Sequence, residues 1–294
     1  MYISPCPSTL YSDKTILVDE NIRKKFKDYL IKIKKEALQK VQELEGDINK
    51  IKYKYPFQYF LFSELSCTFR VQRSLITTLG STWIPNLLKI LVEGRGFIAE
   101  LNYQLKMKLP VEIINKIDEI VNDLDSRKRQ PNIEEELKDL ITLLSNPSTN
   151  LKIVNITADL FIKHPNDLKY SYYIELKTPQ PKKEDCVRSK RRLLLFRIYK
   201  YLMLIKSGIN SQQAFKEALS SAFIGFYYNP FNYTTEQIRK AGRYPHTFVN
   251  GIFELKELVI AEELWDCLGG KGTYQELIKM IDEVLIELGK GKNQ

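Results

Sequence analysis

Two neighbouring segments in the second half of the chain alternate apolar and polar residues, which is the pattern of half-buried β-strands. The first covers Leu151–Lys163 and the second covers Tyr172–Lys177. The turn-forming stretch HPND lies between them and favours an antiparallel hairpin. A continuously apolar segment, Ala222–Tyr228, is typical of a strand that is buried on both faces.

Helical spacing dominates the rest of the chain. Apolar residues recur at steps of three and four from Glu20 to Ile51, and Pro56 fits the first turn of a second helix that ends near Gly80. We therefore expect an α/β protein, with a mixed central sheet flanked by helices in residues 150–294 and a largely helical N-terminal region in residues 1–149. The further helices predicted are Trp83–Val92, Val111–Leu124, Asn132–Leu144, Lys183–Lys206, Gln212–Leu219 and a last helix that begins at Thr273.

Composition narrows the possible partners and sites. The 294 residues include 45 Lys and Arg against 36 Asp and Glu, a net charge of +9, which favours a polyanionic partner, with nucleic acid ahead of an anionic membrane. The chain has only two histidines, which excludes a metal site built from several imidazoles. The four cysteines lie far apart and form no CxxC pair, so we expect four reduced thiols.

The N-terminal residues lack the basic and apolar regions of a signal peptide. No apolar stretch approaches the roughly 18 residues of a transmembrane helix. The longest one, Leu193–Ile205, is interrupted by Arg197 and Lys200. We therefore expect a cytoplasmic protein without a membrane partner.

The two alternating segments bring three charged residues onto one face. A hairpin centred on Asp167 places Asp159 opposite Glu175, with Cβ atoms about 4.5–5.5 Å apart. Lys177 is two residues further along the strand and therefore shares the face of Glu175. The opposite face of both strands is apolar, which disfavours slippage of this register.

This cluster is suited to hydrolysis of a phosphodiester. Two close carboxylates repel each other unless a cation lies between them, and both Lys177 and a divalent metal are such cations. Mg²⁺ is typically held by one or two carboxylates, with water and phosphate oxygens completing its shell. We therefore expect Asp159 and Glu175 to hold Mg²⁺ and Lys177 to orient the attacking water. The alternative is a surface hairpin with an ordinary cross-strand ion pair.

Two basic segments are candidates for DNA contact. The helix after the second strand carries Lys190, Arg191 and Arg192, and core spacing predicts that Arg191 points inward at the site. The long loop after the third strand carries Arg239 and Arg243, whose guanidinium groups are able to read guanines in the major groove. The alternatives are the solvated side of an amphipathic helix and a covering loop without a role in DNA binding.

Asp159 followed by Glu175-x-Lys177 on consecutive strands resembles the PD-(D/E)XK nuclease motif, with Ala158 in the position of the proline. The strings TADLFIK, YYIELKTPQPKKEDC and SKRRLLL resemble type II restriction endonucleases of the TdeIII/MjaII kind. RSLITTLGSTW and ELWDCLGGKGTYQELI add to this resemblance, which extends from Pro56 to Leu285.

The resemblance implies a restriction-endonuclease-like core and Mg²⁺-dependent, site-specific cleavage of double-stranded DNA. It further implies 5′-phosphate ends, a short GC-rich palindrome such as GGNCC as the target, a homodimer, and a cognate DNA methyltransferase as functional partner. Two other functions stay open on the sequence alone. One is a structure-specific DNA repair or junction nuclease, and the other is a non-catalytic DNA-binding protein.

One position departs from the family pattern. An acidic residue is expected in the helix that follows the Thr-x-Gly turn, but positions 83–86 read WIPN. Glu64, on the upstream helix, is the candidate for a further metal ligand, and Glu93 is the second candidate. The alternative for Glu64 is a glutamate that faces solvent.

Overall fold

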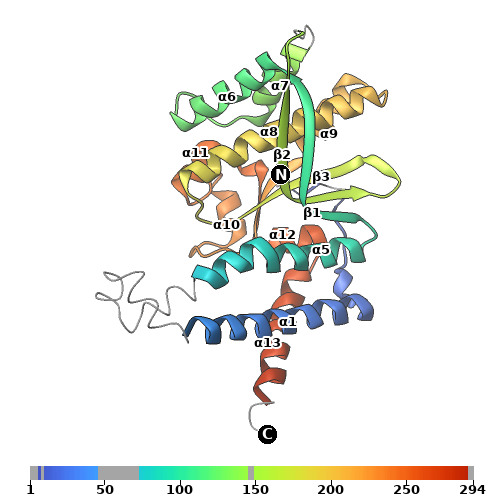
Figure 1. Cartoon of the computed structure of the whole chain (residues 1–294), viewed down its shortest axis with the longest axis vertical. Coiled ribbons are helices and arrows are strands. Elements are labelled where there is room, and N and C mark those ends of the chain that lie inside the picture. Colours follow the sequence, from blue (N-terminus) through green and yellow to red (C-terminus); the bar gives the residue numbers. More distant parts are fainter. Residues whose placement is uncertain (1–5, 8–9, 46–72, 145–148, 291–294) are drawn as a thin grey trace, which may run out of the picture.

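The computed structural model describes residues 6–7, 10–45, 73–144 and 149–290 of the chain. A five-stranded mixed sheet, in the order β1-β2-β3-β4-β5, forms the centre of this part (Figure 1). The β1–β2 and β2–β3 pairs are antiparallel, and the β3–β4 and β4–β5 pairs are parallel. The predicted α/β class is confirmed. The strands are β1 Ile98–Pro110, β2 Leu151–His164, β3 Asp167–Lys177, β4 Ala222–Phe226 and β5 Leu258–Ile260.

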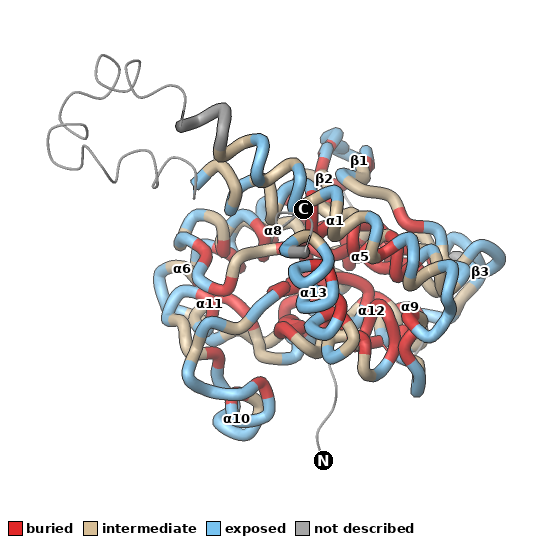
Figure 2. Tube along the Cα trace, turned by 90° about the horizontal axis from the view of Figure 1, so that it is seen from below, coloured by how far each residue is buried: buried red, intermediate tan, exposed pale blue. Residues whose placement is uncertain are grey.

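Helices cover both faces of the sheet, and buried residues gather between the layers (Figures 1 and 2). Core 1 packs one face against α6, α7, α8, α9 and α11, and core 2 packs the other face against α1, α5, α12 and α13. The helices are α1 Glu20–Glu45, α5 Ile84–Gly94, α6 Val111–Asp125, α7 Ile133–Leu144, α8 Lys183–Lys206, α9 Ser211–Leu219, α10 Thr235–Lys240, α11 Thr247–Ile252, α12 Glu262–Gly269 and α13 Thr273–Lys290, with the short helical segments η1 Ile16–Val18, η2 Leu79–Trp83 and η3 Leu255–Glu257.

β1 is the main departure from the sequence prediction, which made the first half of the chain nearly all helical. Leu105, Met107 and Leu109 are buried and alternate with the exposed Lys106 and Lys108, as in a strand with one face on the core. β1 pairs along its length with β2. The sheet therefore combines residues from the ranges 1–149 and 150–294.

The helices before β1 also differ from the prediction. Residues 46–72, which include the start of the helix predicted from Pro56, lie outside the described residues. Among the described residues, Arg73–Gly94 is continuously helical where two helices were predicted, and it alone is long and apolar enough to cross a membrane by length and composition. Leu88 and Leu91 of this helix are fully buried in core 2, so its apolar side pairs with the interior of the molecule.

The prediction of four reduced thiols is wrong for two of the cysteines. Cys6 and Cys267 form a disulfide that joins the N-terminal segment to α12. Cys186 is a buried free thiol, and Cys67 lies outside the described residues. The disulfide joins residues separated by 261 positions, and such a pairing cannot be deduced from cysteine spacing.

The chain after β4 leaves the sheet at the end where β3 finishes. β3 and β4 are parallel, and Lys177 at the end of β3 pairs with Phe226 at the end of β4. The segment that follows was predicted as a long loop but contains α10 and α11. A capping box between Thr234 and Gln237 begins α10. This segment therefore follows the end of the sheet at which β3 finishes with the predicted catalytic residues Glu175 and Lys177.

Candidate active site

The β2–β3 hairpin has the predicted register. Leu160 pairs with Ile174, and Phe161 pairs with Tyr173. Asp159 precedes Leu160 on β2, and its carboxylate Oδ2 accepts a hydrogen bond from the backbone N–H of Leu176 at 2.8 Å. A side chain thus takes the place of a backbone acceptor at the point where the ladder ends.

The side chains of β1 and β2 switch from one face of the sheet to the other beside Asp159. Ala158 belongs to core 1 and Leu160 belongs to core 2, although strict alternation predicted that both share one face. On β1, Asn102 lies between the residues that pair with Leu160 and Ala158, and its φ of 51° is in the left-handed region. The prediction of a single apolar face along β2 is therefore wrong, because the backbone is irregular here. An irregularity of this kind redirects side chains.

The three predicted site residues form one cluster. The Nζ atom of Lys177 lies 3.2 Å from Oδ2 of Asp159 and 3.1 Å from Oε2 of Glu175. The Glu175 side chain is fully buried, whereas 29% of the Asp159 side chain is exposed. The ammonium group therefore bridges one interior carboxylate and one carboxylate that reaches the surface.

Helix α8 supplies two further contacts to the buried carboxylate. Nη1 of Arg192 lies 3.2 Å and 3.0 Å from the two carboxylate oxygens of Glu175, and the Ser189 hydroxyl donates to Oε2 at 3.4 Å. Arg191, which was predicted to point inward at the site, instead pairs with Asp118 of α6 at 2.6 Å. Ser189 was not among the predicted site residues. Its spacing of three residues from Arg192 places both on one helical face, which is the signal in the sequence for this contact.

Burial and charge act in opposite directions on the cluster. Burial raises the pKa of Glu175 above its ordinary value, and the Asp159 carboxylate adds to this against the cations of Lys177 and Arg192. Burial disfavours the ammonium of Lys177, but Glu175 and Asp159 outweigh it and hold the pKa of Lys177 above its ordinary value. Lys177 is therefore a cation at neutral pH.

The donor atoms of the cluster fit a hard divalent cation. Both bonds to Asp159 fall on Oδ2, so Oδ1 has no protein partner within the described part of the chain. The backbone carbonyl of Leu176 lies 3.2 Å from the Lys177 ammonium and adds a third oxygen donor to the two carboxylates. These potential metal ligands are all oxygen atoms, which suits Mg²⁺ rather than a softer metal.

Neither candidate for a further carboxylate ligand joins the cluster in the described structure. Glu93 pairs with Lys89 on α5 and has no hydrogen bond or ion pair with Asp159 or Glu175. Glu64 lies outside the described residues. In the described ranges, no three His, Cys, Asp or Glu side chains are grouped so as to hold a metal. A metal at this site would therefore take most of its ligands from water and substrate, as Mg²⁺ commonly does.

Two of the predicted DNA contacts lie inside the protein. The side chain of Lys190 is fully buried and pairs with Glu136 at 2.6 Å and with Glu257 at 2.8 Å. Arg239 is nearly buried, and it pairs with Glu263 and also donates to backbone carbonyls. The structure therefore corrects the expectation that Lys190 and Arg239 contact DNA, because their charges are already used to hold elements together.

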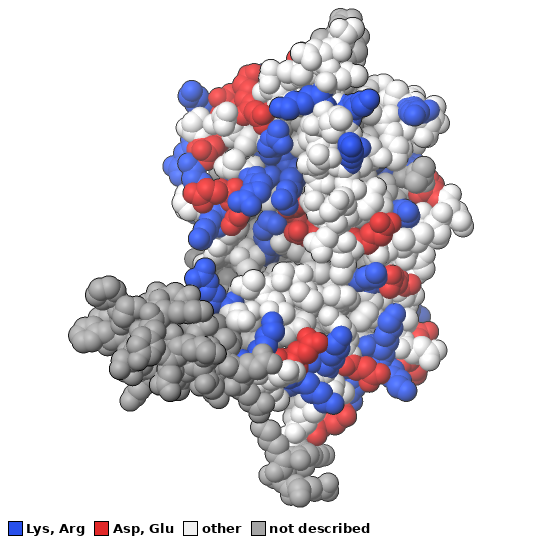
Figure 3. Space-filling model, in the orientation of Figure 1, with Lys and Arg blue, Asp and Glu red and all other residues white. Residues whose placement is uncertain are grey.

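The three remaining predicted contacts reach the surface. Arg191 and Arg192 are partly exposed, with 35% and 29% of their side chains accessible. Arg243 is exposed in the segment between α10 and α11. Figure 3 shows one face of the molecule on which Lys and Arg side chains gather over the region of α6, α8 and α11, with acidic side chains among them.

Known proteins match most of the chain. The family model described as "Type II restriction endonuclease, HinfI" matches residues 16–285. The type II restriction enzyme MjaII of Methanocaldococcus jannaschii is 29% identical over 217 residues, which cover 71% of this chain and 53% of that enzyme. The type II restriction enzymes HgiEI and HgiBI of Herpetosiphon aurantiacus are each 27% identical over 219 residues, which cover 73% of this chain and 71% of each enzyme.

The chain thus spans about half the length of MjaII and a larger share of the two Herpetosiphon enzymes. No solved structure matches it. The predicted resemblance to type II restriction endonucleases is confirmed by the family match and by these relatives.

Proposed function

This chain belongs to the HinfI family of type II restriction endonucleases, and from that premise we propose that it cuts both strands of DNA at a specific sequence with Mg²⁺ as cofactor. The observation that carries the proposal is the cluster of Asp159, Glu175 and Lys177 at the end of the β2–β3 hairpin. Its two carboxylates and one ammonium suit the metal-assisted hydrolysis of a phosphodiester, and the Lys177 ammonium lies within hydrogen-bond distance of both carboxylates.

Each residue of the cluster has a distinct role in this proposal. Asp159 and Glu175 would hold the metal through their carboxylate oxygens. When bound, a divalent metal acidifies a water molecule and offsets the charge that develops on the phosphate. The Lys177 ammonium orients the attacking water and adds a positive charge beside the phosphate. Because its pKa is raised, Lys177 is better suited to orienting the water than to accepting its proton.

Ser189 and Arg192 are positioning residues in this scheme. Both bond to the Glu175 carboxylate, and they fix its orientation from α8. The Arg192 guanidinium is also partly exposed, so it is able to contact a DNA phosphate from the same position. The neighbouring Arg191 is a second candidate for such a contact.

The finer features of the proposal rest on the family. We expect 5′-phosphate ends, a short GC-rich palindrome such as GGNCC as the target, and a homodimer on the DNA. A restriction enzyme acts where foreign DNA enters the cell, so we expect a cytoplasmic location. Its own genome needs protection, which makes a cognate DNA methyltransferase the functional partner.

Digestion of a long duplex with Mg²⁺ or Mn²⁺ tests the proposal. Discrete bands are expected, whereas cleavage restricted to branched DNA would indicate a repair nuclease, and no cleavage with either metal would indicate a binding protein.

Lys177→Ala should lower the cleavage rate by at least about 100-fold and leave specific binding largely intact. Lys32→Ala, which removes an exposed lysine of α1, is the matched control and should cut normally. Wild-type turnover in Lys177→Ala would remove this residue from the mechanism.

A further inference from the structure

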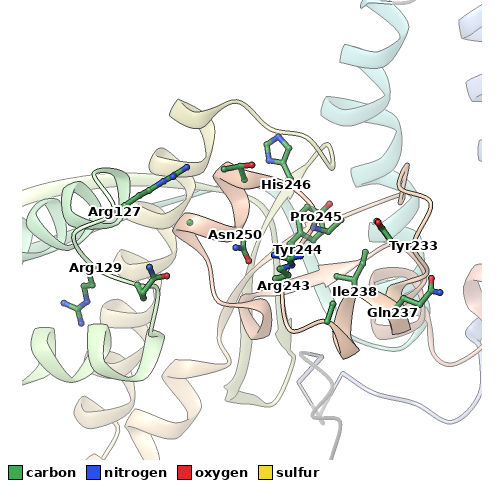
Figure 4. A pocket seen from close by; sticks show the side chains of 14 residues that line it. Arg127, Arg129, Tyr233, Gln237, Ile238, Arg243, Tyr244, Pro245, His246 and Asn250 are labelled. Carbon is green, nitrogen blue, oxygen red and sulfur yellow. The ribbon is translucent and has the colours of Figure 1, made fainter.

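A pocket of about 590 Å³ lies between the turn after α6 and the segment that carries α10 and α11 (Figure 4). Arg127 and Arg129 line one wall, and Arg243 lines the other. No Asp or Glu is among its described lining residues, so every formal charge there is positive. The amide groups of Gln130 and Asn250 also line the hollow and add neutral hydrogen-bonding groups.

Two of the three arginines have no acidic partner. Arg129 pairs with Asp139 of α7 at 2.9 Å. Arg127 and Arg243 are exposed, and within the described ranges neither has an ion pair or a hydrogen bond through its side chain. Two guanidinium groups without an acidic partner give this pocket a positive charge, which favours an anionic ligand. Guanidinium groups bind phosphate oxygens in a bidentate geometry.

The backbone of Arg127 gives a second, independent indication. Its φ is 58°, in the left-handed region, directly after the end of α6. This position at a helix terminus is usually taken by glycine, because other residues are strained there. The turn is held by backbone hydrogen bonds from Arg127 to Leu124 and from Lys128 to Asp123. A long cationic side chain thus occupies a position that favours glycine, and this side chain lines the pocket.

The wall that carries Arg243 is joined to the catalytic strand. The hydroxyl of Tyr244 donates to the carbonyl of Pro179 at 3.1 Å, two residues beyond Lys177. The Tyr244 ring stacks on Phe226, with 4.9 Å between ring centroids, and Phe226 pairs with Lys177 across the sheet. The pocket wall is therefore fixed to the strand end that holds the active-site cluster.

The opposite wall is anchored to the same part of the protein. The backbone N–H of Ile133, at the start of α7, donates to the Glu254 carboxylate at 2.7 Å. Lys256 pairs with Glu134 at 3.1 Å across the same junction. Both walls are thus held in place by contacts outside the pocket, so the pocket does not depend on a ligand to form.

We propose that this pocket holds a backbone phosphate of bound DNA, outside the bond that is cut. Arg127 and Arg243 pair with that phosphate from the two walls, and the amides of Gln130 and Asn250 bond to the adjoining sugar or base. The inference rests on the proposed function, since it assigns a DNA contact to the same enzyme. Arg127 and Arg243 act as positioning residues, because they hold the duplex against the cluster without touching the reacting atoms.

Salt-dependent DNA binding tests the proposal directly. Binding of a labelled duplex without divalent metal is measured for wild type, Arg127→Gly, Arg243→Ala and the double variant. Loss of the phosphate contact in the double variant should lower the magnitude of the slope of log affinity against log salt by about 0.9, and each single variant should lie between it and wild type. Lys279→Ala removes one exposed cation from α13 and should keep the wild-type slope. Arg127→Gly should bind DNA more weakly because it removes the guanidinium group. Its Tm should stay equal or rise, because glycine tolerates the left-handed backbone of position 127.

Two results would overturn the proposal. One is that Arg127→Gly and Arg243→Ala keep the affinity and the slope of Lys279→Ala. The other is that inorganic phosphate raises the Tm of wild type and not of the double variant while duplex binding is unchanged, which would make the pocket a site for small anions.

Cleavage kinetics separate this inference from the proposed function. With Mg²⁺, loss of a DNA-holding contact should raise KM and leave kcat nearly unchanged, in contrast to Lys177→Ala. A loss of kcat as large as that of Lys177→Ala would overturn the positioning role. If wild type shows the arginine-dependent slope but cuts no DNA, the pocket inference stands and the proposed function fails. If wild type cuts and the arginine variants bind as it does, only the pocket inference fails.

Discussion

Asp159 is the residue at which three features of the structure coincide. The ladder between β2 and β3 ends there, both long strands change face there, and the carboxylate accepts the N–H of Leu176. The same oxygen contacts Lys177. A single side chain therefore both ends the regular pairing and joins the cluster, so its backbone role and its charge must be tested separately.

Asp159→Asn separates the two roles. Asparagine keeps an oxygen that can accept the Leu176 N–H but removes the charge that repels Glu175. We expect cleavage to be lost while Tm in the absence of metal is unchanged or rises, as measured by digestion and by thermal unfolding in a chelator. Asp118→Asn, which removes the partner of Arg191, is the control for loss of an ordinary ion pair. A large fall in Tm for Asp159→Asn alone would instead indicate a structural ion pair.

The three cluster residues were predictable because a short hairpin fixes its own register. The contacts of α8 were not, and Arg191 and Arg192 exchanged their expected roles. α8 is buried on nearly all sides, so its apolar residues do not mark one inner face. Apolar spacing therefore could not predict which of its arginines points toward Glu175. Lys190 was misassigned for the same reason, since its acidic partners come from α7 and from η3.

At the scale of elements, α8 is held in place by ionic groups inside the protein. Glu257 of η3 accepts from both Lys190 and Arg197 at 2.8 Å, whereas Glu136 of α7 pairs with one cation, Lys190, and accepts the backbone N–H of Asn132 at 3.1 Å. Burial opposes the charge on Glu257, but Lys190 and Arg197 outweigh it and lower the pKa of this carboxyl. Burial dominates at Glu136 and raises its pKa. The two carboxylates are therefore unequal members of the network.

Glu257→Gln and Glu136→Gln should differ accordingly. Removing Glu257 leaves two buried cations with one carboxylate, and breaking a buried pair costs about 3–5 kcal/mol. Glu136→Gln removes a group that is already closer to neutral, so we expect a loss of about 1–2 kcal/mol. Urea unfolding of both variants measures the difference. Equal losses would show that the charges of the network are shared rather than centred on Glu257.

The buried ammonium of Lys200, also on α8, should make the stability of the protein depend on pH. This ammonium donates to the carbonyl of Lys169 and the hydroxyl of Ser171. Burial lowers the pKa of Lys200 to about 8, against the opposing carboxylates of Glu217 and Asp167. The unfolded value is about 10.4, so between these two pH values the unfolded chain binds more protons and the contribution of Lys200 to stability rises with pH.

Comparison of wild type with Lys200→Met isolates this contribution. The unfolding free energy of wild type relative to the variant should rise by up to about 3 kcal/mol between about pH 8 and pH 10.4. Chemical denaturation at several pH values measures it. A difference that is constant across this range would contradict the lowered pKa of Lys200.

Most elements were predictable, and the exceptions have physical causes. β1 carries a readable alternation from Leu105 to Leu109, but its partner strand begins about 40 residues later, and the left-handed Asn102 interrupts the pattern. β5 has only three residues and is defined by its parallel pairing with β4, which no local pattern indicates. The β2–β3 hairpin was found because its pairing is local, and β4 was found because its residues are continuously apolar, whereas β1 and β5 were missed.

At the scale of the whole molecule, the sheet and its two helical layers were predictable as a class, but the contacts between the chain ends were not. Thr15 and Thr273 share a hydrogen bond of 2.7 Å, and the disulfide joins the same two regions. Gly270, with φ of 91°, lies so close to Lys14 that a Cβ atom would overlap its carbonyl oxygen. These contacts depend on the finished fold, and sequence spacing carries no information about them.

We expect two chains to bind one DNA duplex. Each chain has one cluster of Asp159, Glu175 and Lys177, which is able to cut one strand at a time. A palindromic duplex presents the same site twice about a two-fold axis, and a symmetric dimer matches it. Analytical ultracentrifugation with a short cognate duplex should show two chains per duplex. A complex of one chain per duplex that still makes double-strand breaks would contradict this prediction.

The position of β1 at the edge of the sheet has a consequence for how the protein behaves in a concentrated solution. An edge strand offers a row of N–H and C=O groups to any other strand, and long edge strands therefore promote aggregation. β1 has features that oppose this: the charged Lys106 and Lys108, the left-handed Asn102, and Pro110, which has no N–H to donate. A strand that the sequence prediction missed thus also carries residues that oppose the joining of sheets from separate molecules.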